Sequence, residues 1–600
     1  MRRRLGRSAW GVGAALVLAI SIGITLRQLA LVAARPARFS GALIVRDMPS
    51  LLASTRLPRA VRVVVVRDEA AASFHDSPAV LDSIVDAWRD ALAATGADAR
   101  IVASSGLARA PRPDVLVVPA APCLSIATRE ALDRAGSRGQ GLIISGAPGT
   151  HDAGCRAIGF GLLVAMTGAS RAAVLDDPPM VYVTIPNGGL LGADVPPGAR
   201  IDVDPGGQIA LRGTGREGVY TRYDLRPAPA ADSPLLDGAL ARAVYRGAPV
   251  AWWGFEPHRV LDRPWDRAVM RLLVRNSLAW AARIPLATIE PWPGDHHAAV
   301  VIAQDVESGF ANARFAADSL RAIGLPSTFF LTSRLALRNR RVARTLLRSG
   351  EVGSHSEDHR LLGGTPVAEQ QARLRATQRD LAEITGGSVA GLRPPEEQFD
   401  RGTFEAWIAA GGRYVLGSNG SRSAAPELLA IGDDTLTLLP RTGLDDLAAI
   451  QKAGNDPGIA EALLDEEFRH IRGLGGLYAF SYHSQLLSRS EHVPVVARLA
   501  RTFAADPTVW VATAGDVAAW WRARATLAIE VRARGGHRLE LVVRNPGGDS
   551  VRDAVARVML PAGRRAAVDG RLESPPDVVR VLLPALGPGE ARTVTISLDG

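Results

Sequence analysis

The sequence predicts an α/β fold with a small β-sandwich at the carboxyl end, and three observations support this prediction. Apolar strand-like segments alternate with amphipathic helix-like segments over residues 41–290. Further apolar strands within residues 291–524 end in acidic or histidine side chains. Residues 525–600 largely alternate apolar and polar side chains with period two. Alternating strands and helices favour a parallel sheet, whereas consecutive period-two strands favour an antiparallel sandwich.

Length and composition limit the class of protein. A chain of 600 residues has room for three or four domains, and 47% hydrophobic with 22% charged side chains excludes a disordered chain. The formal net charge is +9, but residues 1–40 hold seven arginines and no acid, which leaves +2 for the remainder. Because that remainder is almost neutral, we expect no nucleic-acid partner. The two cysteines exclude a disulfide-dense scaffold.

Residues 1–40 are predicted to form a cytoplasmic tip and a transmembrane signal anchor. Four arginines among the first seven residues precede an uncharged run of 19 residues, Ser8–Leu26. A helix of that length spans a hydrocarbon core of about 30 Å, and the preceding arginines favour a cytoplasmic amino terminus. We therefore expect a single-pass protein of the cytoplasmic membrane with an extracytoplasmic body. A cleaved signal peptide, which would release the body, is the alternative.

Residues 41–290 are predicted to form a doubly wound α/β domain. The apolar runs and one amphipathic segment predict strands at 61–66, 99–104, 114–119 and 141–145 and a helix over 78–95. These segments resemble class I glutamine-amidotransferase-like domains, and residues 250–256 fit the closing strand of such a domain. An active member would carry a nucleophilic cysteine between glycines, and neither Cys123 nor Cys155 has that setting. The resemblance therefore implies a non-catalytic domain, in which the two cysteines either pair or are buried as small apolar residues.

An acidic pair follows an apolar strand that begins at Ala299. Asp305 and Glu307 are two residues apart in extended chain, so both side chains can face the same side. Barrel enzymes place catalytic groups at the carboxyl ends of parallel strands. The pair is therefore a candidate for catalysis, the alternative being a strand end that is simply solvated.

Two histidines lie in the segment that follows a short strand beginning at Glu351. His355 and His359 are four residues apart, which would put them on one face of a helical turn. Two imidazoles and a remote carboxylate make a three-ligand site with one open position, as in catalytic zinc sites. The spacing therefore predicts a metal site.

Two further segments add candidate catalytic groups. Arg393 precedes Pro394 and Pro395, whose rings restrict the backbone that carries the guanidinium. His483 ends an apolar strand from Leu477, and the ordinary pKa of histidine suits a general acid. The alternatives are an exposed arginine in a surface loop and a core histidine that caps its strand.

Together these residues resemble the polysaccharide deacetylase family, also called the NodB-homology or carbohydrate esterase 4 group. The resemblance covers residues 291–524 and implies a distorted (β/α) barrel. Asp305 matches the base of the family's first motif, but Val306 replaces the adjacent metal ligand. Glu307, one residue later, would take that ligand's role. The histidine pair matches fully, the Arg-Pro-Pro segment matches, and the motif that ends at His483 matches loosely.

The resemblance implies a metal-dependent N-deacetylase acting on acetamido groups of an extracytoplasmic polysaccharide, either an exopolysaccharide or a wall glycan. Glu307, His355 and His359 would hold one divalent metal, with Zn²⁺ the expected ion. Asp305 would be the base, oriented by Arg393, and His483 the acid. Ser356, Pro394 and Pro395 would contact the substrate, and Asp446 is the candidate that tunes the acid. The alternatives are a degenerate glycan-binding protein and a hydrolase of another C–N amide bond.

Residues 525–600 are predicted to form an accessory β-sandwich. The alternation of apolar and polar residues predicts strands at 526–532, 538–544, 556–560 and 593–597. Because no constellation of titratable side chains occurs there, we expect no catalytic role for this part of the chain.

Overall fold

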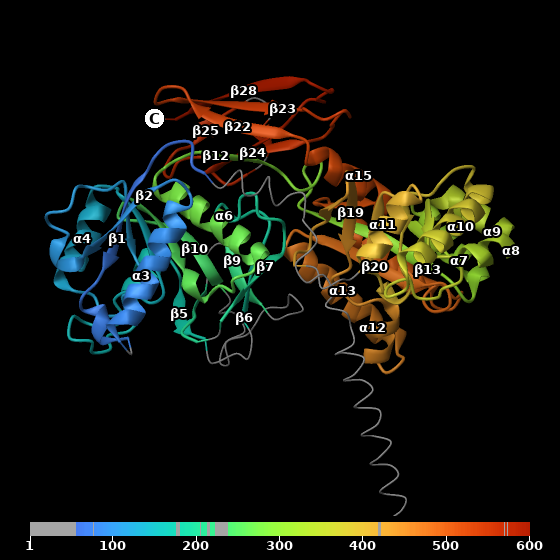
Figure 1. Ribbon diagram of the computed structural model, residues 1–600, viewed down its shortest axis with the longest axis horizontal. Helices are drawn as coiled ribbons and strands as arrows, with labels where there is room; N and C mark the ends of the chain where they lie inside the picture. The colour runs from blue at the N-terminus through green and yellow to red at the C-terminus, as the bar shows by residue number, and fades with distance from the viewer. Residues whose placement is uncertain are drawn as a thin grey trace, which may run out of the picture.

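The computed structural model describes residues 56–599 except 76, 176–180, 205, 213–216, 222–237, 418–421, 569–570 and 573. Two α/β units lie side by side, and strands from the carboxyl end lie above the unit that comes first in the sequence and extend toward the other (Figure 1). The predicted α/β class is therefore confirmed as a mixed α/β structure. The boundaries of individual domains stay predictions.

The first unit is built on an eleven-stranded sheet. Its parallel part follows the order β2 (Asp98–Ala103), β1 (Arg62–Arg67), β3 (Val115–Val118), β4 (Gly141–Ser145) and β11 (Ala248–Trp253). The four central residues of β1 are all buried, as the valine run predicts for a strand covered on both faces. The helices of this unit are α3 (Pro78–Ala93), α4 (Ile126–Ser137), α5 (Gly161–Thr167) and α6 (Pro264–Ala281).

The remainder of this sheet is antiparallel, which corrects the predicted alternation up to residue 290. Its strands are β10 (Gly238–Tyr245), β9 (Gly218–Thr221), β6 (Val181–Ile185), β7 (Ala199–Val203), β8 (Ile209–Arg212) and β5 (Arg171–Val174). No helix separates these strands among the described residues between β5 and β11. The amino acids explain this, since β7 alternates buried and half-buried side chains and so suits one covered face. The likeness to an amidotransferase domain stays a prediction.

Cys123 and Cys155 form a disulfide, with their Cα atoms 5.1 Å apart. Of the two alternatives left open by the sequence, the structure therefore has the paired one. The bond joins the segment after β3 to the segment after β4.

The second unit is built on a nine-stranded sheet that is parallel except at β18. Its order is β18 (Glu427–Ile431), β19 (Asp434–Pro440), β17 (Tyr414–Gly417), β16 (Gly391–Leu392), β15 (Glu351–Ser354), β14 (Thr328–Leu331), β13 (Ala298–Val306) and β20 (Leu477–His483), with β21 (Val509–Ala512) also paired to β13. The ends of this order are not paired to each other among the described strands, so the curled sheet is an open barrel.

Helices surround this sheet, as expected for a β/α barrel. They are α7 (Ala313–Ala322), α8 (Ser333–Arg338), α9 (Arg340–Ser349), α10 (Val367–Thr385), α11 (Arg401–Ala409), α12 (Asp446–Lys452), α13 (Pro457–Gly473), α14 (Val493–Ala504) and α15 (Ala514–Arg524). Strand β13 is buried along its whole length and pairs with β14, β20 and β21. Its register places Asp305 directly beside His483.

The carboxyl-terminal residues form two four-stranded sheets that share one hydrophobic core. One contains β12 (Leu286–Ile289), β24 (Val555–Met559), β27 (Val578–Leu582) and β26 (Arg571–Leu572), and the other contains β22 (Ala528–Ala533), β23 (Arg538–Arg544), β28 (Ala591–Leu598) and β25 (Ala566–Ala567). Strand β12 comes from the segment between the two α/β units and pairs with β24. The accessory role of these sheets stays a prediction.

The predicted membrane anchor requires a correction. In the described part of the chain, no helix has the length and apolar character needed to cross a membrane. Helix α10, for example, has 19 residues but carries six charged side chains. This finding contradicts the predicted signal anchor, the single-pass location and the membrane partner. The run Ser8–Leu26, on which that prediction depended, lies outside the described residues.

Candidate active site

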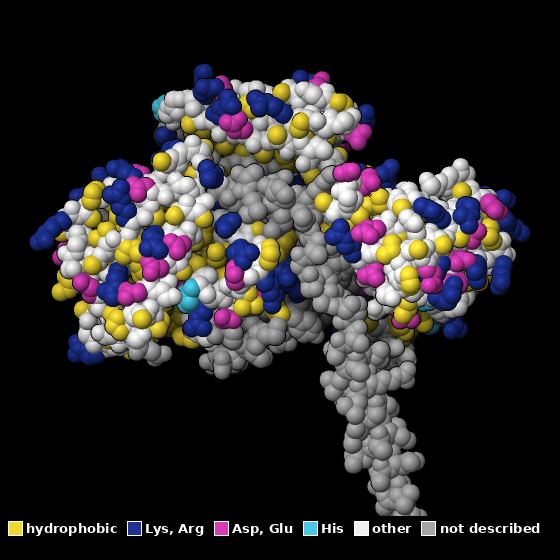
Figure 2. Space-filling view, viewed as in Figure 1, with side chains coloured by type: hydrophobic (Ala, Val, Ile, Leu, Met, Phe, Trp, Pro, Cys, Tyr) yellow, Lys and Arg dark blue, Asp and Glu magenta, His cyan; other side chains and the backbone are white. Residues whose placement is uncertain are grey.

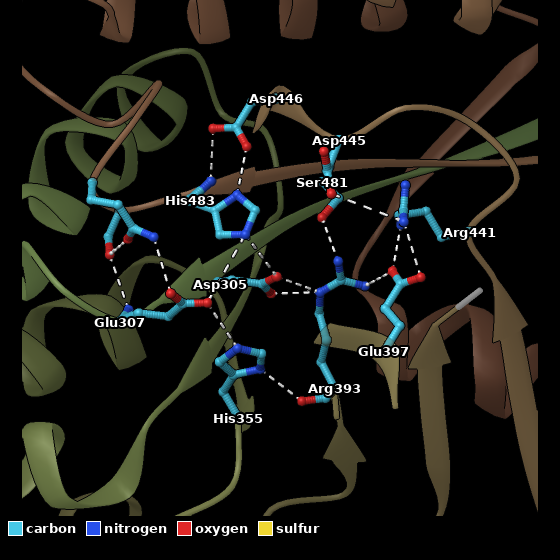
Figure 3. Close-up of polar contacts among 12 residues, drawn as sticks. Asp305, Glu307, His355, Arg393, Glu397, Arg441, Asp445, Asp446, Ser481 and His483 are labelled. Atoms are coloured by element: carbon cyan, nitrogen blue, oxygen red, sulfur yellow. Dashed lines mark hydrogen bonds and ion pairs between the residues drawn. The ribbon is translucent and has the colours of Figure 1, made fainter. Parts of the chain in front are cut away.

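Acidic, basic and histidine side chains meet at the carboxyl edge of the barrel sheet (Figure 3). The strand β13 contributes Asp305, and Glu307 follows directly. His355 follows β15, Arg393 follows β16, and His483 ends β20. These strands are neighbours in the sheet, so residues up to 178 positions apart in the chain become contacts.

Both histidines point at one oxygen of Glu307. The Nε2 atoms of His355 and His359 lie 3.1 Å and 2.9 Å from Oε1 of Glu307. His355 is buried, whereas the side chain of His359 is 35% exposed, so the cluster opens to solvent beside His359. Burial would raise the pKa of Glu307, but the hydrogen bonds and charges of the two imidazoles, when these are protonated, hold it well below its usual range.

The backbone around the histidine pair differs from the predicted helical turn. Ser356 and His359 have left-handed φ values of +61° and +64°, so the segment is an irregular turn and not a helix start. The backbone N–H of His355 donates to the carbonyl of Leu331 at 2.8 Å, which extends the pairing of β15 with β14 and fixes the first imidazole. The two rings nevertheless converge, with centroids 5.0 Å apart.

The tautomer of His355 tests whether these residues fit a metal ion. Its Nδ1 lies 2.7 Å from the carbonyl oxygen of Arg393, and a carbonyl only accepts, so Nδ1 carries the proton. In the neutral ring, Nε2 then directs a lone pair at the carboxylate oxygen of Glu307. That contact requires a cation between the two atoms, either a proton or a metal ion. Glu307, His355 and His359 offer ligand atoms within 4.8 Å of one another, and this donor set fits Zn²⁺.

Asp305 is buried and paired with Arg393. The Nε–H of Arg393 donates to Oδ2 of Asp305 at 2.7 Å, and its Nη2–H donates to Oγ of Ser481 at 2.8 Å. Asp305 is 3% exposed and Arg393 is 2% exposed. A buried guanidinium of this kind forms a charge-assisted hydrogen bond with the carboxylate and fixes its orientation.

A second carboxylate and a second guanidinium extend this pair, and the sequence reasoning did not find them. Nη1 of Arg393 lies 3.0 Å from Oε1 of Glu397. Glu397 also accepts from Arg441, whose Nη2 lies 3.0 Å from Oε2. Although burial opposes it, the charges of Asp305 and Glu397 raise the pKa of Arg393. Glu397 lies four positions after Arg393, and Arg441 lies in the segment that contains Asp446, but nothing in either segment marks the two as partners.

His483 is held by Asp446. The Nδ1–H of His483 donates to Oδ1 of Asp446 at 2.6 Å, and its backbone N–H donates to Oδ2 at 2.9 Å. Asp446 is fully buried as the first residue of α12, whose amino end is capped by the side chain of Asp445. Burial alone would lower the pKa of His483, but the hydrogen bond and charge of Asp446 raise it to about 9.

The other ring nitrogen of His483 faces both acids of the first motif. Its Nε2 lies 3.8 Å from Oδ2 of Asp305 and 4.0 Å from Oε1 of Glu307. A protonated His483 therefore directs an N–H toward the space between the two carboxylates. This arrangement places an acid and a base on either side of one point.

Two residues after β20 orient Glu307, and they too were missed. The Nε2–H of Gln485 donates to Oε2 of Glu307 at 3.0 Å, which leaves Oε1 to face the histidines. The backbone N–H of Glu307 donates to Oγ of Ser484 at 3.0 Å. Gln485 lies two positions after His483 in the sequence, and this closeness to a candidate catalytic residue could have indicated its place in the site.

Three residues predicted to contact the substrate lie in the wall of the site. Ser356, Pro394 and Pro395 are all buried. Pro394 accepts a hydrogen bond from the backbone N–H of Glu397 at 3.0 Å and so helps to shape that turn. These positions favour support of the neighbouring ligands, and direct contact with the substrate stays a prediction.

The comparisons with known proteins agree with this site. Residues 303–415 match the family model described as polysaccharide deacetylase, which is the family that the motifs resemble. The matched region runs from within β13 to within β17 and includes Asp305, Glu307, both histidines and Arg393. No curated protein sequence matches the chain.

Solved structures similar to this chain include two that are named as polysaccharide deacetylases. The first, from Mycobacterium smegmatis, is 22% identical, with 40% of this chain and 94% of that chain covered and a TM-score of 0.36. The second, from Pseudomonas aeruginosa PAO1, is 16% identical, with 38% and 93% covered and a TM-score of 0.34. A PuuE allantoinase is 16% identical, with 39% and 92% covered and a TM-score of 0.34.

Proposed function

We propose that the protein is a metal-dependent N-deacetylase that hydrolyses acetamido groups of a polysaccharide. The observation that carries the proposal is that Glu307, His355 and His359 direct their ligand atoms at one point. Beside that point, Nε2 of His483 lies 4.0 Å from Oε1 of Glu307 and 3.8 Å from Oδ2 of Asp305. The polysaccharide deacetylase family match supports the reaction class. A free amine on the sugar and acetate would be the products.

Glu307, His355 and His359 would hold one divalent ion, with Zn²⁺ the expected one. When bound, such an ion polarises an acyl carbonyl and lowers the pKa of water. Asp305 accepts a proton from the attacking water, and the hydrogen bond from Arg393 orients Asp305. His483 donates its Nε2 proton to the departing nitrogen as the C–N bond breaks. Two carboxylates would repel in this buried space, and the histidines and Arg393 offset that repulsion.

Two measurements on the full chain test the proposal. Metal content is determined by elemental analysis for the wild type, His355→Ala, His359→Ala and, as a matched control, the exposed His537→Ala. Acetate release is measured on N-acetylglucosamine oligomers, with Asp305→Asn as the inactive control. We expect about one equivalent of metal, which only the two site variants lose, and acetate release that Asp305→Asn abolishes.

Other results would contradict the proposal in separable ways. A wild type that takes up no metal after zinc is added would exclude the metal-dependent reaction. A metal-loaded protein that binds the oligomers without releasing acetate would favour the glycan-binding alternative. Release of ammonia or of a small amine from other acylated substrates, without action on sugars, would favour a hydrolase of another C–N bond.

A further inference from the structure

A cavity of about 340 Å³ lies at the amino edge of the parallel strands in the first unit, on a different sheet from the candidate active site. Arg62 begins β1, Asp114 directly precedes β3, and Gly141 begins β4. Five basic side chains and one acidic side chain line this cavity, which we call the arginine pocket: Arg59, Arg62, Arg112, Arg138, Arg283 and Asp114.

The described acids that line the arginine pocket do not balance its positive charge. Among the described lining residues, Asp114 is the single carboxylate, and it lies 3.4 Å from Nη2 of Arg62. Arg59 donates to the carbonyl oxygen of Ala282 at 3.1 Å, which is a neutral acceptor. The side chains of Arg112 and Arg138 have no hydrogen bond or ion pair within the described part of the chain. Five guanidinium groups therefore face one carboxylate.

This imbalance is local. Residues 41–600 carry a net charge of only +2, and basic and acidic side chains are interspersed on the face shown in Figure 2. A concentration of one sign around a cavity focuses the field and raises the local concentration of the opposite ion. The arginine pocket is therefore suited to an anion.

Backbone carbonyl groups hold the side chain of Arg283 in a fixed position. Nη2 of Arg283 donates to the carbonyl oxygen of Gly247 at 2.9 Å, and Nη1 donates to the carbonyl oxygen of Gly139. The end of α6 packs so closely on β4 that a Cβ atom at Gly141 would lie 2.1 Å from the carbonyl oxygen of Ala281. Arg283 also adopts a left-handed φ of +54°. The loops that carry Arg138 and Arg283 are therefore locked against each other.

The lining selects the chemistry of the ligand. Guanidinium N–H groups form paired hydrogen bonds with the oxygens of carboxylates and phosphates. A volume of about 340 Å³ lies at the lower end of the range for small-molecule sites. The apolar lining is confined to Pro113, Ala281 and Ala282, so a large apolar ligand would find little to contact.

We propose that the arginine pocket binds the carboxylate or phosphate group of a small anionic ligand. This site is separate from the proposed deacetylase centre, and its existence does not depend on that activity. Two sources share the chemistry. One is an acidic sugar unit of a glycan, such as a uronate, and the other is free phosphate.

Isothermal titration of the full chain at low salt tests the proposal with two probes, inorganic phosphate and a trimer of galacturonic acid. The test variant is Arg112→Ala/Arg138→Ala, whose side chains are exposed and hold no described partner, so folding should be unaffected. The control is Arg344→Ala/Arg375→Ala, which removes the same charge from exposed positions on α9 and α10. Circular dichroism checks that all variants fold.

We expect at least one probe to bind the wild type and the control variant alike, with affinity at least about tenfold lower in the pocket variant. Affinity should also fall as salt rises from about 0.05 M to 0.2 M. Tighter binding of the trimer than of phosphate supports an acidic glycan, and the reverse supports free phosphate. No binding of either probe, or equal losses in the two double variants, would overturn the proposal.

Discussion

Asp446 holds His483 at two atoms, accepting from Nδ1 at 2.6 Å and from the backbone N–H at 2.9 Å. Because Asp446 is fully buried, its charge acts on the ring with little screening by water. The contact also places a proton on Nδ1, since a carboxylate can only accept. The second proton of the protonated ring is therefore on Nε2, the nitrogen that faces Asp305 and Glu307.

This contact predicts the alkaline limit of activity. His483 has a pKa raised to about 9, so it is protonated below that pH and loses its proton as the pH rises through it. Activity that needs the acid should therefore fall above about pH 9. In Asp446→Asn the raising charge is lost, and the limb should move toward the ordinary histidine pKa of about 6.5. The pH profile of kcat/KM gives the alkaline limit of activity for the wild type and for the variant. If the two limits were the same, His483 would not be the acid.

Metal binding should stabilise the barrel. At free zinc about 100 times the Kd, a ligand that binds only the folded state adds about 2.7 kcal/mol to the free energy of unfolding. Thermal denaturation with and without a chelator should show this as a shift of Tm. His359→Ala should lose most of the shift, whereas the exposed His537→Ala should keep it. If neither zinc nor the chelator changed the Tm of the wild type, the proposed metal site would be contradicted.

Gln485→Leu should weaken the metal site without removing a ligand. Gln485 fixes Oε2 of Glu307, and loss of such an outer partner commonly lowers metal affinity by about 10–100-fold. A competition titration against a zinc-binding dye gives the Kd directly. Gln451→Leu, at an exposed position of α12, is the control. Equal affinities in both variants would show that Glu307 keeps its orientation unaided.

Glu397→Gln should lower both stability and turnover. The change leaves Arg441 and Arg393 with an uncompensated charge in a largely buried place, and breaking such a pair costs about 3–5 kcal/mol. A less fixed Arg393 should reduce kcat more than it changes KM, because the proposed role of Asp305 is in the chemical step. Urea denaturation and steady-state kinetics measure the two effects.

A matched control for this prediction is Glu405→Gln, which breaks the exposed ion pair with Arg401 on α11. Its cost should stay below about 1 kcal/mol, as for surface pairs in general. A Glu397 variant with unchanged kcat would show that Arg393 is held by Asp305 and Ser481 alone.

The residues that the sequence made visible share a local signature. Asp305 and His483 lie at the ends of apolar strands. The pattern of apolar and polar residues along the chain is enough to locate such an end. The valine run before Asp68 and the strand at 141–145 were visible for the same reason. Strand order then brings these ends together, as β13 lies between β14 and β20.

Residues that depend on contacts distant in sequence were not visible. Glu397 and Arg441 are 44 positions apart and meet because β16, β17 and β19 are neighbours in the sheet. The helical spacing of His355 and His359 misled for a related reason. Left-handed backbone at Ser356 bends the segment into an irregular turn, and residue spacing contains no information on that conformation.

The pairing of β12 with β24 has a consequence for biosynthesis. Leu286 and Met559 are direct partners, although 272 residues, including most of the barrel, separate them. Strand β24 also needs β27, which ends at Leu582. While the ribosome works, β12 can find no partner in its sheet until nearly the whole chain has emerged. Both α/β units therefore have time to fold before β12 is paired, and completion of its sheet is a late step of folding.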